Sequence, residues 1–441
     1  MSTLTADAPQ TSGNGAAGAH GQAPLPDTVT AIALILGWKV FTFVVTFVAW
    51  SVLPFNHGLR NANLRWGERD DGSFAAALST WDSQHYIRIA EAGYQPGLLT
   101  NAFGPFYPWL IRGLNLVTGD SIVSGLLISN VASGLALYLL YRFVRQRFSQ
   151  QTAWRTLILF LAFPTAFYLN LVYTEGLFLL LLLTFFGALY QRRMAIVAVC
   201  CFLLPLLRLP GLVVALPLAW TMVTDLLQAK TARRDPLALQ GEGAGGAVTP
   251  DAGKPGGKQL QGSGLPSPQP GSGLGGGVPL LSLLALAAGL LAYLGYMHIE
   301  LDNAFVAMDT EKMYISHRSL DNLLQPWHLV EDLLRTDLVW HNYLDSAMDR
   351  AFFVLFVASL PLVWRKTDVP MALFATVMVL QPFLGSFMSY TRLAMVAFPI
   401  YIAWASMLEG HDRRLVYLAA APLLVLQVVL LSKHVTSDWV A

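Results

Sequence analysis

The stretch YTEGLFLLLLLTFFGALY, residues 173–190, decides the fold class, because Glu175 is the one acidic or basic residue within it. A helix that crosses a membrane needs about 20 predominantly apolar residues. In hydrocarbon, every backbone N–H and C=O group has to find its partner within the protein, so a stretch of this composition is expected to be an α-helix. The sequence therefore predicts at least one transmembrane helix.

The composition of the whole chain points the same way. Of 441 residues, 55% are hydrophobic and 12% are charged, and the mean hydropathy is +0.51. A soluble domain carries roughly 25% charged residues, so an ordinary soluble enzyme is excluded. The net charge of +1 predicts no attraction to nucleic acid. Cys200 and Cys201 are neighbours in an apolar run and are expected to be buried thiols; without a metal-ligand motif, we expect neither a metal nor another cofactor.

Applying the same test along the chain predicts an all-α integral membrane protein with about eleven transmembrane helices. The expected spans are residues 29–53, 121–141, 156–170, 173–190, 194–207, 209–227, 278–298, 350–364, 370–387, 392–408 and 414–432. Prolines at or near span ends predict broken or tilted helices there. These prolines are Pro164, Pro205, Pro210 and Pro382.

Basic residues set the expected orientation, because cytoplasmic loops carry an excess of Lys and Arg. With the N-terminus inside, eleven spans place all five basic clusters on the cytoplasmic side. These clusters are Arg142, Arg145, Arg147 and Arg155; Arg192 and Arg193; Lys230, Arg233 and Arg234; Arg365 and Lys366; Arg413 and Arg414. We therefore predict a multi-pass protein of the cell membrane.

The chain divides at two tracts that do not resemble folded structure. Their Gly, Pro and Ser content predicts a disordered tail and a flexible cytoplasmic linker. No internal repeat is visible, which counts against an inverted-repeat transporter. The predicted parts are the tail 1–28, a first membrane part 29–227 with an outer loop 54–120, the linker 228–277, and a second membrane part 278–441 with an outer loop 299–349.

The first outer loop, which is long and expected to carry amphipathic helices, contains STWDSQHYIRIAEAGY, residues 79–94. Asp82, His85 and Arg88 fall at i, i+3 and i+6, within an arc of about 120° on a helix. Thr80 is expected to cap its start. A carboxylate beside a His and an Arg forms a plausible general base with its orienting groups. The alternative is an interfacial amphipathic helix with ordinary ion pairing.

Three more ionisable residues are expected at the outer ends of spans. Glu175 starts a span, where an acid near a helix N-terminus is also favoured for stability alone. Arg208 and Arg392 suit phosphate, although an Arg at a helix end can also extend to the membrane surface. In the second outer loop, spacing does not separate ligands from a solvated loop for Lys312, His317, Arg318 and His341.

Taken together, a carboxylate, a His and several arginines converge on the outer face. Arginines would bind a phosphate on a lipid, and a carboxylate would deprotonate an acceptor. No GxxxxGK[ST] loop for a nucleotide is present. The pattern predicts group transfer from a lipid phosphate donor.

These motifs also resemble a known family. WDSQHYIRIAEAGY followed by FGPFYPWLIR is similar to the signature of the PIG-V-like mannosyltransferases, a bacterial and eukaryotic family of GT-C glycosyltransferases. The later motifs YTEGLF, RLPG and SYTRLAMVAFP follow in the expected order. The tail, the linker 228–277 and most of the second outer loop have no match.

The resemblance implies a GT-C fold and an inverting enzyme whose active site lies on the extracytoplasmic face. The donor would be polyprenyl-phosphate mannose, held at the lipid bilayer, and no divalent metal would be required. By the same resemblance Asp82 is the catalytic base, Glu175 assists it or binds sugar hydroxyls, and Arg208 and Arg392 neutralise the phosphate. The remaining substrate-binding residues implied are Trp81, His85, Arg88, Tyr94, Tyr107, Tyr173 and Tyr390.

Three alternatives stay open at this stage. The first is a transporter of polyprenyl lipids. The second is a non-catalytic membrane protein that binds lipid-linked sugars or a partner protein. The third is a related enzyme that uses another sugar or transfers to protein Ser or Thr. The acceptor, whether a lipid, a glycan or a protein, and any protein partner cannot be identified from the sequence.

Overall fold

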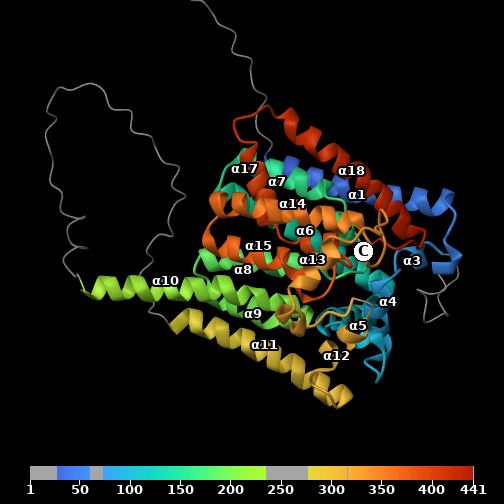
Figure 1. The fold of residues 1–441 in the computed structure, drawn as a ribbon, viewed down its shortest axis with the longest axis horizontal. Helices are drawn as coiled ribbons and strands as arrows, with labels where there is room; N and C mark the ends of the chain where they lie inside the picture. The colour runs from blue at the N-terminus through green and yellow to red at the C-terminus, as the bar shows by residue number, and fades with distance from the viewer. Residues whose placement is uncertain (1–26, 60–72, 235–276, 315, 441) are drawn as a thin grey trace, which may run out of the picture.

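The computed structural model describes residues 27–59, 73–234, 277–314 and 316–440, and within these ranges it is built mainly of helices (Figure 1). The one β-type pairing among the described residues is an isolated bridge between Val339 and Ser346. The all-α expectation is therefore confirmed for this part of the chain.

Six helical segments are long and apolar enough to cross a membrane, which indicates a multi-pass membrane protein. Three shorter apolar helices accompany them, and a total of eleven spans stays a prediction. The long segments are α1 (Thr28–Val52), α6 (Ser121–Arg147), η4 with α10 (Leu209–Val214 and Ala215–Arg234), α11 (Gly277–Leu301), α14 (Ala347–Lys366) and α18 (Arg414–Val435). The shorter ones are α8 (Glu175–Tyr190), α9 (Met194–Leu207) and α15 (Val369–Val379).

Several expected spans are interrupted helices, and prolines lie next to the interruptions. The span expected at 156–170 consists of α7 (Gln150–Ala162), which ends two residues before Pro164, and η3 (Ala166–Asn170). The one expected at 392–408 is α16 (Tyr390–Ala394) followed by α17 (Pro399–Met407). Proline has no N–H to donate, so it starts a helix readily and disrupts one that precedes it. The breaks leave short segments of backbone deep in the bundle.

The two predicted outer loops form short helices that gather toward one end of the long helices (Figure 1). The first loop forms α3 (Phe74–Ala77), α4 (Asp82–Ala92), η2 (Leu99–Ala102) and α5 (Phe106–Thr118). The second forms α12 (Val306–Met313), η5 (Leu320–Leu324) and α13 (Trp327–Leu333), and η6 (Gln381–Leu384) follows α15.

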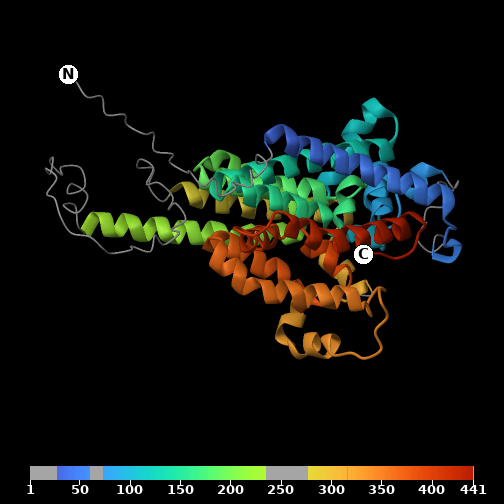
Figure 2. The same ribbon diagram turned by 90° about the horizontal axis from the view of Figure 1, so that it is seen from above.

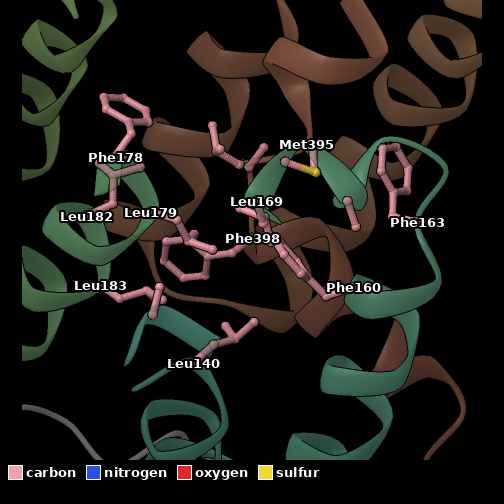
Figure 3. Close-up of a cluster of buried hydrophobic side chains, with 14 of the residues drawn as sticks. Leu140, Phe160, Phe163, Leu169, Phe178, Leu179, Leu182, Leu183, Met395 and Phe398 are labelled. Carbon is pink, nitrogen blue, oxygen red and sulfur yellow. The ribbon is translucent and has the colours of Figure 1, made fainter. Parts of the chain in front are cut away.

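The helices pack around a central pair, α6 and α8. On one flank α8 contacts α9, which packs along α11; on the other, α18 packs on α1 and α7. Figure 2 shows α14 and α15, in orange, on the side of α18 opposite to α1. The core between α6, α7, α8 and the α16–α17 region is packed with apolar side chains, and Figure 3 shows several of them, among them Leu140, Leu182 and Phe398. This core fixes the start of α8 relative to α16.

The basic loops meet at one end of the bundle. Arg147 at the end of α6 pairs with Asp368 at 2.7 Å, beside the predicted cluster at 365–366. Arg155 donates to the carbonyl oxygen of His411 at 2.8 Å, beside the cluster at 413–414. Arg145 donates to Thr28 Oγ1, at the start of α1, at 2.8 Å. The shared position agrees with the predicted topology, and which side of the membrane it faces stays a prediction.

The predicted tail falls almost entirely on residues 1–26, outside the described residues. Residues 235–276 of the predicted linker also lie outside the described residues. The first residues of that linker are helical, because α10 continues to Arg234 instead of ending at 227.

Candidate active site

Four ionisable side chains from separate segments form one continuous ion-paired group. Arg392 Nη2 donates to Asp82 Oδ2 at 2.6 Å, and Arg392 Nε lies 3.5 Å from Glu175 Oε1. Arg208 Nη1 donates to the same Glu175 oxygen at 3.2 Å. We call Asp82, Glu175, Arg208 and Arg392 the ion-paired cluster. All four were predicted as site residues, and the fold brings them together.

The two carboxylates of the cluster occupy the same kind of position. Asp82 is the first residue of α4, and Glu175 is the first residue of α8. The N-terminus of a helix carries a partial positive charge and unpaired N–H groups, so an acid is favoured there. Glu175 is nearly inaccessible, with 2% of its side chain exposed, whereas Asp82 is 21% exposed. Solvent and substrate therefore have more access to Asp82.

Arg392 is the centre of the ion-paired cluster. Its side chain is 7% exposed, and its guanidinium lies 5.3 Å from the ring centroids of both Tyr168 and Tyr173. A guanidinium within about 6 Å of an aromatic face is attracted by the ring. Two carboxylates and two rings thus fix the charge of Arg392 in place, and Tyr168 is a neighbour that the sequence did not single out.

Arg208 reaches the cluster from the junction of α9 and η4. The chain folds back sharply here, because Gly211 packs directly on α9: a Cβ at this position would lie 2.7 Å from the backbone of Leu204. Only glycine permits this approach without displacement. The RLPG motif therefore has a physical role, since its glycine directs Arg208 toward Glu175. The Arg208 side chain is 17% exposed, so it can contact a ligand.

Trp81 holds the backbone directly before Asp82 in an unusual conformation, with φ 56° and ψ −126°. Such a conformation costs of order 1–3 kcal/mol in a residue other than glycine and persists where neighbours enforce it. Here Trp81 Nε1 donates to the carbonyl oxygen of Asp438 at 3.1 Å, and its ring packs edge-on against Tyr343 and Trp439. The side chain of Trp81 thus anchors the start of α4.

The charge state of Asp82 follows from this environment. Burial works to raise the pKa of Asp82, but Arg392, with smaller contributions from His85 and Arg208, outweighs burial, so that the pKa lies below its usual value. Asp82 is accordingly ionised at neutral pH, as a proton acceptor has to be.

The other predicted residues of α4 lie beside the cluster. The ring of His85 stacks on Phe103, with centroids 4.6 Å apart, and the positive charge of His85 lowers the pKa of Asp82. Arg88 Nη2 donates to Gln95 Oε1 at 3.0 Å. Thr80 does not cap α4, in contrast to our expectation; Trp81 occupies the cap position, and Thr80 Oγ1 pairs with His434 Nε2 at 3.0 Å.

The predicted tyrosines take different places. Tyr94 donates to the carbonyl oxygen of Phe103 at 2.6 Å. Tyr107 pairs with Ser129 Oγ at 2.6 Å, and Ser129 donates to the carbonyl oxygen of Tyr173 at 2.9 Å, so Tyr107 supports the segment before Glu175. The ring of Tyr390 is buried in the core among phenylalanine rings and lies edge-on to Phe353. Of these tyrosines, Tyr173 is the one whose ring contacts the ion-paired cluster.

Two residues of the second outer loop extend the charged region, and sequence spacing gave no reason to choose them. Arg318 Nη2 donates to the carbonyl oxygen of Met388, four residues before Arg392. Burial raises the pKa of Glu311, against the lowering effect of Arg318, and the charge of Asp82 raises it further. Burial likewise lowers the pKa of Arg318, which interacts with Glu311 and the cluster arginines. The second loop therefore contributes two half-buried side chains of opposite charge that interact electrostatically with the cluster.

A separate cavity of about 280 Å³ lies in the second outer loop, between η5, α13 and η6. His317, Asn322, His328, Arg335 and Ser386 are among its lining residues, which include none of the ion-paired cluster. Among the described residues, no group of three His, Cys, Asp or Glu is arranged to hold a metal ion. The expectation that the protein needs no metal stays a prediction.

Comparison with known proteins gives a match to a protein family. Residues 102–196 match the family model described as dolichyl-phosphate-mannose-protein mannosyltransferase, a family of GT-C enzymes. The comparison with curated proteins found no match. The matched stretch runs from η2 to α9 and contains Tyr107, Tyr173 and Glu175; it covers less than half of the chain. This part of the chain is similar to enzymes named for transferring mannose from a lipid phosphate, and the similarity indicates a membrane-embedded glycosyltransferase.

Proposed function

We propose that the protein is an inverting glycosyltransferase that moves mannose from polyprenyl-phosphate mannose to an acceptor hydroxyl at the extracytoplasmic face of the membrane. The observation that carries the proposal is the ion-paired cluster, in which two carboxylates and two arginines from four segments meet at the ends of helices. Stabilising a departing lipid phosphate needs the arginines, and activating the acceptor needs a carboxylate. The match at residues 102–196 supports the donor class.

The four residues take distinct roles in the proposed reaction. The Asp82 carboxylate accepts the proton of the acceptor hydroxyl as that oxygen bonds to C1 of mannose. The bond from C1 to the phosphate oxygen breaks, and its electron pair leaves with the polyprenyl phosphate. Attack opposite to the leaving group inverts the configuration at C1. Arg392 and Arg208 stabilise the negative charge on the departing phosphate, a contribution that is generally the largest in such sites.

Arg392 is hydrogen-bonded to Asp82, and the proposal gives this hydrogen bond a role. A donor phosphate competes with Asp82 for the guanidinium, since both are oxygen anions that pair with Arg. When the phosphate takes Arg392, the charge that lowers the pKa of Asp82 is partly neutralised, and Asp82 becomes a stronger base. Donor binding would thus precede activation of the acceptor.

Glu175 is suited to bind the sugar. Its Oε1 accepts from Arg208, while Oε2 is buried with no hydrogen-bond donor among the described residues. A buried acceptor without a donor is costly, so a ligand hydroxyl at this position would be favoured. With 2% of the side chain exposed, Glu175 would meet the sugar only after it has entered the site.

Sugar transfer in membranes tests the proposal. Membranes that contain the chain, and matched membranes without it, receive polyprenyl-phosphate mannose with a radiolabelled sugar, and label is followed into lipid, glycan and protein fractions. We expect chain-dependent transfer, with the product linkage of opposite anomeric configuration to the donor by mannosidase digestion. Retained configuration contradicts the inverting mechanism. Donor binding without transfer favours a binding protein, and movement of intact donor across sealed vesicles favours a transporter.

A further inference from the structure

Asp349 is a buried carboxylate that the proposed reaction does not use. It is the third residue of α14, with 0% exposure, and its backbone N–H donates to Ser346 Oγ at 3.1 Å. Ser-x-x-acid at a helix start usually forms a local pair, in which the acid reaches back to the capping residue. A fully buried carboxylate is expensive unless it is hydrogen-bonded, so its partners identify its task.

The partner of Asp349 is Thr391, from a distant part of the chain. Asp349 Oδ1 accepts two hydrogen bonds from this one residue, from the backbone N–H at 2.8 Å and from the hydroxyl at 2.6 Å. Hydrogen bonds to an ionised acceptor are roughly twice as strong as neutral ones. The Asp349 carboxylate therefore anchors the backbone directly before Arg392.

Thr391 is also held on its other side. Its carbonyl oxygen, in the peptide bond to Arg392, accepts from Thr165 Oγ1 at 3.1 Å. Ser389, two residues earlier, adopts a left-handed conformation with φ 58°, which is strained for serine. The short helix α16 has too few residues to be stable alone. The position of α16 thus depends on contacts with other segments, and the contacts of Thr391 are the ones nearest to Arg392.

We infer that Asp349 is a positioning residue, which acts through Thr391 to keep the backbone of Arg392 in place while its guanidinium passes from Asp82 to the donor phosphate. The inference rests on the proposed function, in which Arg392 binds that phosphate. During the exchange, the 2.6 Å bond to Asp82 is given up, and the bonds to Asp349 are independent of it. The anchor at the backbone then limits where the freed side chain can reach.

The second oxygen of Asp349, Oδ2, is buried with no hydrogen-bond partner among the described residues and faces the second outer loop. His341 Nδ1 lies 3.5 Å from Asp349 Oδ2 and 2.8 Å from Ser346 Oγ. His341 Nε2 donates to the carbonyl oxygen of Val440 at 2.5 Å, which fixes the ring. The second outer loop and the segment at Val440 thus fix the ring of His341 beside Asp349 and the capping Ser346.

Variants of Thr391 and Asp349 test the inference. Thr391→Val keeps the shape but loses the hydroxyl bond, and Asp349→Ala loses both bonds. Thr391→Ser keeps the hydroxyl that donates, and Asp349→Asn keeps an oxygen that accepts, so these two are the rescue variants. For each, mannose transfer is measured against donor concentration and divided by the amount of monodisperse protein. We expect Thr391→Val to lower kcat and kcat/KM by about tenfold each, since it acts on transition-state binding, and the rescue variants to stay within about threefold of wild type.

Asp368 provides a matched control. It also accepts the N–H of a helix start, that of Met371 at 3.1 Å, but it lies at the basic end of the bundle. Asp368→Ala is expected to lower the yield of folded protein and leave kcat per folded molecule unchanged. If Thr391→Val behaves in the same way, Asp349 and Thr391 stabilise the fold without positioning Arg392, and the inference is overturned.

A stability cycle separates this inference from the proposed function. Unfolding temperatures are compared for Thr391→Val, Arg392→Gln and the double variant. Contacting residues that act together give non-additive effects, so we expect Thr391→Val to lower the unfolding temperature less when Arg392 is already absent. Equal shifts in both backgrounds contradict positioning. If wild type transfers no mannose, the proposed function fails, and this cycle still decides whether Thr391 and Arg392 are coupled.

Discussion

Replacing Arg392 with glutamine should destabilise the protein by about 3 kcal/mol, because it removes the charge between two carboxylates. Breaking a buried ion pair by removing one partner costs roughly 3–5 kcal/mol. Arg392 and Glu175 are 7% and 2% exposed, which favours the full cost. Asp82 is 21% exposed and can be partly solvated, and Glu175 keeps Arg208 at 3.2 Å, so the lower end of that range applies.

The assay is thermal unfolding of purified protein in one detergent, with Arg192→Gln as the matched control. Arg192 pairs with Asp225 at 2.5 Å, but the two side chains are 38% and 23% exposed. Exposed pairs are worth about 0–1 kcal/mol. We expect the shift in unfolding temperature for Arg392→Gln to be several times that for Arg192→Gln. Equal shifts, or a larger one for Arg192→Gln, would refute the view that the cluster is a buried, mutually dependent unit.

Three further predictions concern pH, packing and topology. Burial raises the pKa of Asp82, but neighbouring positive charges lower it by more, so the folded pKa lies below the unfolded value of about 4. The ionised carboxylate therefore stabilises the fold above pH about 4, and this stabilisation is lost as the pH falls through the folded pKa. The unfolding temperature of Asp82→Asn should accordingly fall less than that of wild type between pH 5 and pH 3. Gly211→Ala should lower the free energy of unfolding by about 1–3 kcal/mol, because the added Cβ would lie 2.7 Å from backbone atoms. Gly187→Ala, whose Cβ would have nothing within 4 Å, should be neutral or stabilising. Similar costs for the two variants would contradict the packing argument. An impermeant thiol reagent added outside intact cells should label Ala92→Cys, the exposed last residue of α4, and leave Gln146→Cys, at the basic end, unlabelled. The reverse pattern would invert the topology.

Local patterns in the sequence predicted much of the helical framework. The long apolar runs appear as α1, α6, α14 and α18, near the expected bounds. The same patterns also marked α4 and the residues at its start, because Asp82 precedes a run with helical spacing. The breaks were harder to place, since the apolar run 392–408 was expected as one span, and the structure interrupts it between α16 and α17, where Pro399 begins the second helix.

Long-range pairing was beyond the reach of the sequence. Asp82 and Arg392 are 310 residues apart, and only the fold shows that they share a hydrogen bond. Tyr390, two residues from Arg392, was expected in the site and lies among phenylalanine rings, because side chains two positions apart on α16 point to nearly opposite sides of the helix. Asp349 resembled an ordinary helix-start acid, and its bonds to Thr391 gave no signal in the sequence.

The most direct test of the central claim is a single-turnover measurement with Asp82→Asn. Purified wild type and variant are mixed in excess with polyprenyl-phosphate mannose and acceptor membranes, and transferred label is followed over time. Glu91→Gln, an exposed acid at the far end of the same helix, serves as the matched control. The proposed mechanism predicts that Asp82→Asn abolishes measurable transfer while donor binding persists and that Glu91→Gln retains the wild-type rate. Transfer by Asp82→Asn at the wild-type rate would contradict the assignment of Asp82 as the base.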